Sequence, residues 1–227
     1  EYPFTPILEK LSDKVISENI ILHNDNIFSG DDFSITFGNT SAGGLEVYHN
    51  GEQLAGASVI MAGAVLQGKH IEIGKGVLIE TGAIVKSPVV IGDCNEVRQG
   101  AYIRGDVVTG RGCVLGHTTE IKHSIFLDHA KAGHFAYLGD SILGTDTNLG
   151  AGTKFANLKF LHTSISIKTS DGLIDTGRKK FGAILGDKAQ TGCNSVTNPG
   201  TLMAKGAMLM PNTTAPSGYH EPMTVLR

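Results

Sequence analysis

The sequence predicts an all-β protein built as a parallel β-helix, and three observations lead to that fold class. Aliphatic residues recur at every sixth position from Ile73 onward, a period that neither an α-helix nor a simple strand produces. A second column of small or β-branched residues begins four positions later, at Val77. Thirty glycines, about twice the usual number, indicate many turns.

The two columns predict one short strand and one turn per repeat, with three repeats closing one triangular coil. Each inward side chain then stacks on its equivalent in the next coil. The first column consists of Ile73, Ile79, Val85, Ile91, Val97, Ile103, Thr109, Leu115, Ile121 and Leu127, and it resumes at Leu185, Thr191, Thr197, Met203 and Leu209. The second consists of Val77, Ala83, Val89, Ala101, Val107, Cys113 and Thr119. Cys113 is therefore expected to be a small core residue.

Two regions interrupt the period. The stretch 5–18 predicts a helix, because Thr5 can cap it and Pro6 suits the first helical position. We therefore expect residues 1–30 to form a helical cap segment and residues 31–227 to form the β-helix domain. Within that domain, the alternating residues and the Ser-Asp-Gly turn of 158–181 predict a β-hairpin arm.

Composition limits the classes of partner and compartment. A formal net charge of −3 provides no global attraction for nucleic acid or for a membrane surface. Three cysteines without Cys-x-x-Cys spacing fit a reducing compartment better than a disulfide scaffold. There is no run of 18 apolar residues and no signal-peptide pattern at the start. These features predict a cytoplasmic protein that binds neither nucleic acid nor membrane.

Three residues stand out before any family is considered. His134 follows Gly133, where the aliphatic column lapses, and an imidazole suits proton transfer at neutral pH. The alternative is a histidine at a solvated turn. Arg104 and Lys122 are 18 positions apart, so they should stack in adjacent coils and repel unless an anion lies beside them. This favours a phosphate site, although single basic residues on such a surface usually face solvent.

Several stretches, in order and with similar spacing, resemble a known family over about residues 91–212. They are AYIRGD, TEIKHS, AGHFAYLGDS, DTNLGAGT, RKKFGAILGD and KGAMLMPNT. The chain is similar to the C-terminal acetyltransferase domain of the bifunctional UDP-N-acetylglucosamine pyrophosphorylases/glucosamine-1-phosphate N-acetyltransferases. The resemblance implies a left-handed β-helix, a homotrimer, and acetyl-CoA-dependent N-acetylation of an amino-sugar phosphate such as glucosamine-1-phosphate. It implies no metal cofactor.

Carried over position by position, the resemblance implies a general base at His134, with Glu120 near the amine. It also implies residues around the amino sugar and its phosphate: Arg104, Lys122, Tyr137, Asn148, Asn157 and Lys180. Cys193 and Pro211 fall where the family contacts acetyl-CoA.

The departures from the family leave the acceptor open. The nucleotidyltransferase half with its Leu-x-Gly-Gly-x-Gly loop is absent, so we expect no sugar-nucleotide synthesis from UTP by this chain. A separate nucleotidyltransferase is then a possible partner. Leu158 stands where short bacterial members have tyrosine. The arm resembles the longer archaeal-type members, but Thr163 and Ser166 stand where those tend to have lysines.

Two other classes of function stay open from the sequence. One is a zinc-dependent hydrolase like the β-helical carbonic anhydrases, since His129 and His134 are five positions apart. The position of the third histidine in those enzymes is Asp93 here, which counts against it. The other is a non-catalytic trimeric scaffold or regulatory protein. Metal analysis would separate the first class from the acetyltransferase, and acetyl-CoA binding would separate the second.

Overall fold

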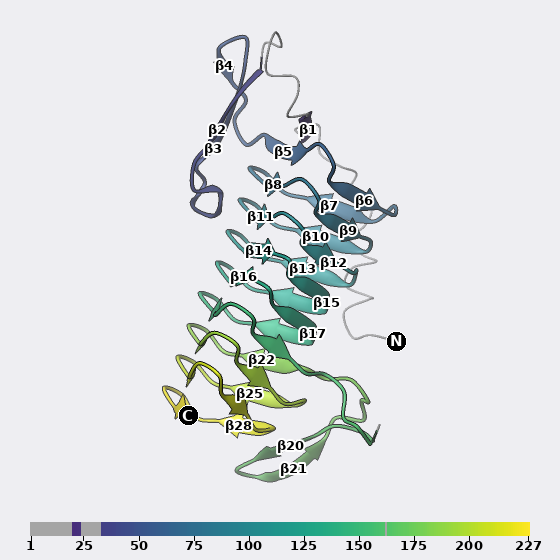
Figure 1. The fold of residues 1–227 in the computed structure, drawn as a ribbon, viewed down its shortest axis with the longest axis vertical. Helices are drawn as coiled ribbons and strands as arrows, with labels where there is room; N and C mark the ends of the chain where they lie inside the picture. The colour runs from purple at the N-terminus through teal and green to yellow at the C-terminus, as the bar shows by residue number, and fades with distance from the viewer. Residues whose placement is uncertain (1–19, 24–32, 162) are drawn as a thin grey trace.

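The structure, a computed structural model, describes residues 20–23, 33–161 and 163–227, and most of these residues wind into a parallel β-helix (Figure 1). This confirms the predicted all-β fold class. Within the described ranges the helical structure consists of one 3-10 turn, η1 (Thr40–Ala42). The helix expected at 5–18 lies outside the described residues.

The coil has three faces of parallel strands. The first face is a 10-stranded sheet of β1 (Ile20–His23), β5 (Ser58–Met61), β8 (Leu78–Ile79), β11 (Glu96–Val97), β14 (Val114–His117), β16 (Lys131–His134), β18 (Asn148–Leu149), β23 (Gln190–Thr191), β26 (Met208–Leu209) and β29 (Val225–Leu226). Strand β1 falls inside the segment expected to be a cap, and it pairs along its whole length with β5.

The other two faces are joined into one 14-stranded sheet, because β15 (Glu120–Phe126) and β17 (Tyr137–Leu143) continue around a corner. The second face contains β6 (Val65–Gln67), β9 (Ile84–Lys86), β12 (Tyr102–Ile103), β19 (Lys154–Phe155), β24 (Val196–Thr197) and β27 (Thr214–Ala215). The third contains β7 (Ile71–Ile73), β10 (Val89–Ile91), β13 (Val107–Thr109), β22 (Ala183–Leu185), β25 (Thr201–Met203) and β28 (Gly218–His220).

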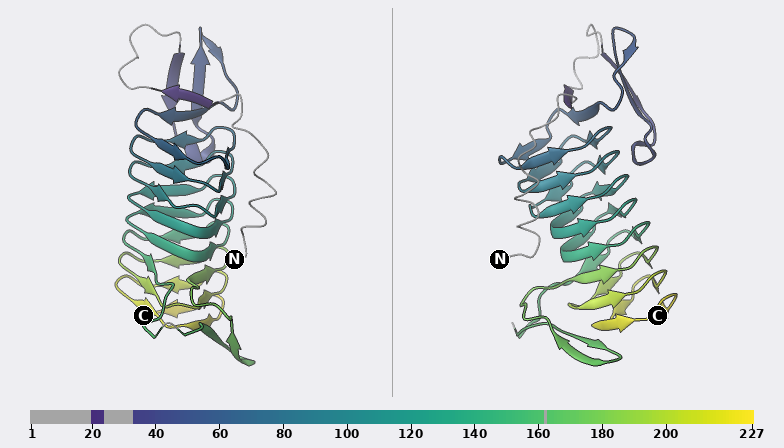
Figure 2. Two further views of the ribbon diagram at one scale, coloured as in Figure 1. Left: turned by 90° about the vertical axis from the view of Figure 1, so that its right-hand side faces the viewer. Right: turned by 180° about the vertical axis from the view of Figure 1, so that it is seen from behind.

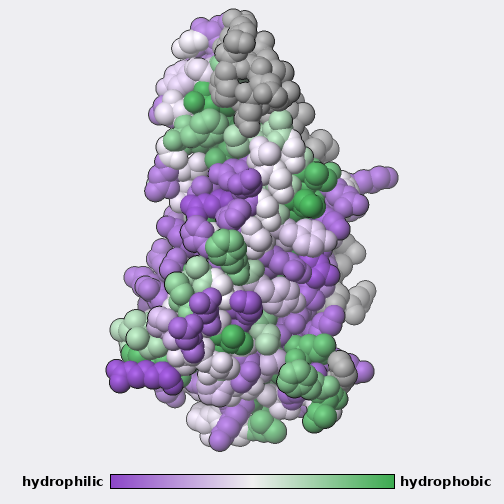
Figure 3. Space-filling view, in the orientation of Figure 1, coloured by the Kyte–Doolittle hydropathy of each residue, from purple (hydrophilic) through white to green (hydrophobic). Residues whose placement is uncertain are grey.

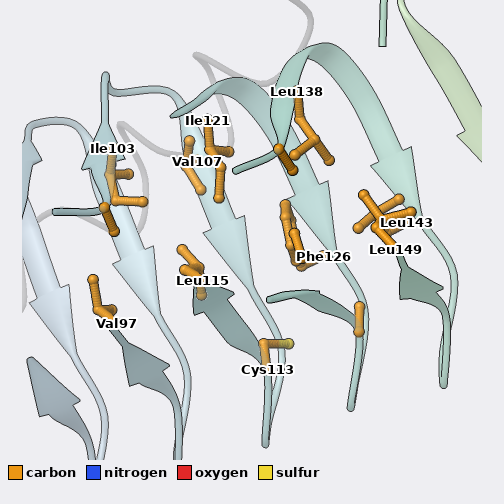
Figure 4. Packing of buried hydrophobic residues seen from close by; sticks show 14 of the residues in the cluster. Val97, Ile103, Val107, Cys113, Leu115, Ile121, Phe126, Leu138, Leu143 and Leu149 are labelled. Atoms are coloured by element: carbon orange, nitrogen blue, oxygen red, sulfur yellow. The ribbon is translucent and has the colours of Figure 1, made fainter. Parts of the chain in front are cut away.

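The strand register confirms the hexad period and corrects it at two points, since the repeats that end at Phe126 and at Leu143 have five residues. Val89 pairs with Val107, a coil of 18 residues, whereas Thr109 pairs with Phe126, a coil of 17. The shorter coil turns Phe126 inward, where it is fully buried, and leaves Leu127 43% exposed. Leu127 was therefore wrongly placed in the first column, because the repeat from Ile121 to Phe126 has five residues. Figure 4 shows Phe126 among the stacked core side chains.

The remaining members of both columns are buried as predicted, including Cys113. Burial raises the pKa of the Cys113 thiol to about 12, so this cysteine stays protonated at neutral pH. Asn95 occupies the position that the second column skips, and its side chain is fully buried. Its amide donates to the oxygens of Gly92, Thr109 and Gly110, so the polar group is satisfied inside the coil.

The predicted arm is confirmed as a hairpin of β20 (Ser166–Thr169) and β21 (Gly172–Asp175), paired antiparallel. It leaves the coil after residue 157 and packs β20 near β28 (Figure 1). Five large apolar side chains of this arm are exposed: Leu158, Phe160, Leu161, Leu173 and Ile174. Figure 3 shows apolar surface gathered over the lower right of the molecule, where the arm lies.

Residues 33–53 differ from the expected β-helix. They form an antiparallel sheet of β2 (Phe33–Phe37), β3 (Leu45–His49) and β4 (Glu52–Gln53) beside the first coils (Figure 2). Val47 of β3 is buried against Val59 and Leu78 of the first face, in a small core separate from the coil interior. The tip of the β2–β3 hairpin thereby lies over the first face.

Candidate active site

His134 ends β16 on the first face, and its side chain is exposed. Its backbone pairs with His117 one coil earlier, and its carbonyl accepts a hydrogen bond from the Gly152 amide at 3.0 Å. The column does not lapse here as expected, because Ala132 fills the interior between Leu115 and Leu149. The backbone of His134 is therefore fixed on both sides while its imidazole stays accessible.

A groove of about 620 Å³ lies beside His134 on the first face, and we call it the His134 groove. Asn148 and Cys193 line it, as do Lys131 and the ion pair of Arg98 with Glu96. The structure thus places three of the sequence-predicted site residues around one groove. The opposite wall is the tip of the β2–β3 hairpin, which the sequence analysis had not connected with any site.

Five other predicted residues gather on the second face around Asp140, which the sequence did not single out. We call this group the corner cluster, made of Arg104, Glu120, Lys122, Tyr137, Asp140 and Asn157. Arg104 Nη1 donates to Glu120 Oε1 at 2.6 Å, and Lys122 Nζ lies 3.9 Å from Asp140 Oδ2. Asn157 Nδ2 donates to the same Asp140 oxygen at 2.5 Å, and Tyr137 OH lies 3.5 Å from Asn157 Oδ1.

The positive charges of the stacked residues Arg104 and Lys122 are compensated in a different way from the one expected. Arg104 does neighbour Lys122, since its amide donates to the Ile121 carbonyl. Their repulsion is offset by two carboxylates of the chain itself, Glu120 and Asp140. The hydrogen bond that Arg104 donates to Glu120 raises the pKa of Arg104, whereas burial lowers the pKa of Lys122 despite the attraction of Asp140. The stack therefore does not by itself require a bound phosphate.

Burial also raises the pKa of Tyr137, and Glu120 and Asp140 raise it further. The phenol is therefore protonated at neutral pH and can donate a hydrogen bond to a ligand. Lys180 is exposed and forms an isolated bridge with Leu158 at the base of the arm. The positive charge of Lys180 repels that of Lys122 and helps to lower the pKa of Lys122, so the two side chains interact electrostatically.

Sequence reasoning missed a stack of three residues at the corner between the second and third faces. Asp106, His123 and Asp140 are each 17 positions apart, and all three have a left-handed backbone. His123 Nε2 lies 3.0 Å from Asp106 Oδ2, and Nδ1 lies 3.7 Å from Asp140 Oδ1. The 17-residue spacing was the available signal, but it falls outside the hexad period used to read the sequence.

The predicted residues are therefore divided between two faces that meet at one corner, since β16 ends at His134 and β17 begins at Tyr137. Glu120 lies on the second face, where its Oε1 accepts a hydrogen bond from Arg104 Nη1 at 2.6 Å. Pro211 is exposed one coil beyond Cys193, whose carbonyl accepts a hydrogen bond from Asn212.

Two searches of the described residues complete the description. No group of three or more His, Cys, Asp or Glu side chains there is arranged to hold a metal ion. None of the helical segments in the same ranges has the length and apolar character needed to cross a membrane.

The chain is similar to several known proteins. It is 32% identical to the bifunctional sugar-1-phosphate nucleotidylyltransferase/acetyltransferase of Sulfurisphaera tokodaii, over 59% of this chain and 38% of that protein. It is 31% identical to the bifunctional protein GlmU of Exiguobacterium sp., over 77% of this chain and 36% of that protein. The chain thus spans little more than a third of these relatives. They confirm the resemblance stated from the sequence.

Among solved structures, PerB from Caulobacter crescentus in complex with CoA and GDP-perosamine matches 72% of this chain and 52% of that chain. The sequence identity is 16% and the TM-score 0.31. The family model of the GMPPB C-terminal domain matches residues 85–205, which include His134 and all of the corner cluster. Because that match spans more than half of the chain, the protein belongs to the GMPPB C-terminal domain family.

Proposed function

We propose that the protein is an acetyl-CoA-dependent N-acetyltransferase that acts on an amino-sugar phosphate, with His134 as the general base. The observation that carries this proposal is the His134 groove, which places an accessible imidazole beside a corner where polar side chains can hold a sugar. Two relatives whose names include acetyltransferase or GlmU share the matched region, which supports the same reaction class.

The chemistry requires a base close to the amine. An ammonium group has no lone pair, so it must lose a proton before its nitrogen can attack the thioester carbonyl. The imidazole of His134 takes that proton, the N–C bond forms, and the C–S bond breaks to release coenzyme A as a thiolate, which then takes up a proton. The imidazole is restored when its proton passes to solvent or to the leaving thiolate.

The corner cluster provides the groups that bind the acceptor. Tyr137 and Asn157 offer hydrogen bonds to sugar hydroxyls, and Arg104 and Lys180 offer charge to the phosphate. Arg104 is exposed and must share its guanidinium between Glu120 and the substrate. Lys122 is largely buried against Asp140. Its role is therefore to hold Asp140 in place and to add positive charge to the cluster.

We propose further that the acetyl donor and the acceptor meet between protomers of a homotrimer. One chain places His134 and the corner cluster on opposite sides of a convex corner, which by itself encloses no deep pocket. In a trimer, the groove of one protomer would face the corner cluster of its neighbour. Light scattering at micromolar concentration tests this assembly, and a monomer under those conditions would contradict it.

The decisive experiment measures release of coenzyme A from acetyl-CoA with a panel of amino-sugar phosphates and their unphosphorylated counterparts. We expect His134→Ala to lower turnover by about 10²- to 10⁴-fold, the usual contribution of general-base catalysis. Its residual rate should rise with pH, because the amine then deprotonates in solution. The exposed imidazole contributes little to the core, so His134→Ala should fold normally. Coenzyme binding should therefore be retained.

Two variants serve as controls. Tyr137→Phe keeps the ring and removes the hydroxyl, so it should weaken acceptor binding more than it slows proton transfer. Arg104→Ala should raise KM for the phosphorylated sugar by about 10-fold or more, since a charge-assisted hydrogen bond is lost. If His134→Ala keeps full turnover from pH 6 to 9, or if no amino sugar is acetylated by the intact protein, the proposal is wrong.

A further inference from the structure

The hairpin tip, residues 38–44, is an ordered turn held against the first face. The Gly38 amide donates to the Gly44 carbonyl at 3.1 Å, and the Gly44 amide donates to the Asn39 carbonyl at 2.8 Å. Thr40 is only 2% exposed. A Cβ added to Gly112 would lie 2.8 Å from the Ser41 carbonyl oxygen, so a larger residue there would push the tip away. The tip is therefore a fixed wall above the coil.

Two grooves lie under this tip and share lining residues. The His134 groove, of about 620 Å³, adjoins a second groove of about 520 Å³, and both are lined by Asn39, Ser41, Lys131 and Asn148. The second groove continues to His129 and Gln190. From His134 back to His129 a strand of this length spans on the order of 15 Å, so the two grooves form one trough across the first face.

The trough is lined by uncharged amides and a hydroxyl together with Lys131 and Asp146, whose formal charges cancel. Asn39 and Ser41 project from the tip, where Ser41 Oγ donates to Asn39 Oδ1 at 2.9 Å, and Asn148 and Gln190 come from the coil. The Arg98–Glu96 ion pair at its edge is internally neutralised at 3.1 Å. Such a lining suits an extended, neutral ligand that itself carries amide donors and acceptors.

We propose that the tip of the β2–β3 hairpin forms one wall of the acyl-donor site, where Asn39 and Ser41 hydrogen-bond the pantetheine arm of coenzyme A. This inference rests on the proposed function and names residues that complete its donor site. The arm carries two amides and a hydroxyl and no charge, which matches the trough. Its thioester end lies at His134 and Cys193, and the arm runs beneath the tip toward Gln190.

Calorimetry on the full chain tests the proposal with three probes: coenzyme A, pantetheine, and adenosine 3′,5′-bisphosphate, which lacks the arm. We expect the double variant Asn39→Ala/Ser41→Ala to raise Kd for coenzyme A and for pantetheine by about 5- to 30-fold, the effect of one or two hydrogen bonds. Kd for the bisphosphate and KM for the amino-sugar phosphate should stay unchanged. Asn50→Gly, at the opposite end of β3, is the matched control and should bind all three probes normally.

A chemical measurement keeps the test independent of small changes in stability. Cys193 lines the His134 groove, whereas Cys94 lies in a separate pocket beside Gly43 and Lys75. Acetyl-CoA, which has no free thiol to consume the reagent, should protect Cys193 from iodoacetamide while Cys94 reacts at its usual rate. The double variant should need more acetyl-CoA for the same protection.

The outcomes separate the two proposals. If the unmodified protein binds coenzyme A and the double variant binds it equally well, the role of the hairpin tip is refuted and the acetyltransferase proposal stands. The same holds if the bisphosphate and pantetheine are weakened equally, because the effect would then be general. If the unmodified protein binds neither coenzyme A nor pantetheine, the proposed function fails, and the inference fails with it.

Discussion

Replacing Asn95 tests how a polar side chain is accommodated inside the coil. Asn95 fills the position that the second column skips, Thr109 is a polar member of the first column, and the two contact each other, since Asn95 Nδ2 lies 3.0 Å from Thr109 Oγ1. The Asn95 amide also donates to Gly92 O at 2.7 Å and Gly110 O at 2.8 Å, and its oxygen accepts from the Cys113 amide at 2.6 Å.

Asn95→Ala removes all four interactions and leaves the Cys113 N–H without its acceptor in the interior. One buried, unsatisfied donor costs about 1–3 kcal/mol, and the two carbonyls that lose a donor add to this. The deleted atoms also leave a cavity. We therefore expect Asn95→Ala to lower the free energy of unfolding by about 3–5 kcal/mol. Val89→Ala, in the same column, loses only two methyl groups and should cost about 2 kcal/mol.

Urea unfolding followed by circular dichroism measures both variants. All samples need the same protomer concentration, because the stability of an oligomer depends on it. The comparison uses the midpoint together with the slope, so that a change in cooperativity is detected. If Asn95→Ala costs no more than Val89→Ala, the interior hydrogen bonds contribute nothing beyond volume, and the reasoning is wrong.

Burial lowers the pKa of His123 below its ordinary 6.5, although Asp140 and Asp106 oppose this. Below pH 6.5 the unfolded chain therefore binds a proton that the folded chain does not, so the free energy of unfolding should fall as pH drops through the folded pKa, and His123→Gln should flatten that dependence in urea titrations. Cys113, with a pKa of about 12, should resist alkylation at pH 8 in the native protein, whereas exposed Cys193 should react. Mass spectrometry of labelled peptides measures both, and rapid labelling of Cys113 would contradict its buried position. Phe155→Ala should cost about 3–5 kcal/mol in the same unfolding assay, because the ring is fully buried in the coil, and a loss below 1 kcal/mol would refute this packing.

The fold could be predicted from the sequence because every coil of a solenoid has the same local packing requirement. Each coil must bury an inward residue against the previous coil, so Ile73, Ile79 and Val85 recur at a fixed interval that can be read without long-range information. The arm was visible for the complementary reason, since its alternation and turn replace the hexad pattern. Even Thr109, the exception in the column, marked the place where Asn95 meets it.

The antiparallel sheet of residues 33–53 was missed because its strands are ordinary alternating segments. The local sequence pattern does not indicate whether the hairpin packs on the first face or becomes part of the coil. Its position depends on Val47 finding a buried place against Val59, a contact between residues whose spacing carries no period. The wall above the His134 groove was therefore decided by tertiary packing.

The sequence by itself determined the β-helix, the arm and the set of candidate site residues, because periodic burial and motif order are local properties. Only the tertiary structure decided which of those residues meet. The five-residue repeats that end at Phe126 and Leu143 shift the positions that follow them, and this places Asp106, His123 and Asp140 in one stack and puts His134 and Tyr137 on opposite sides of a corner. Which side chains share a face depends on the sum of all preceding coil lengths, and a single changed repeat alters that sum for every residue that follows.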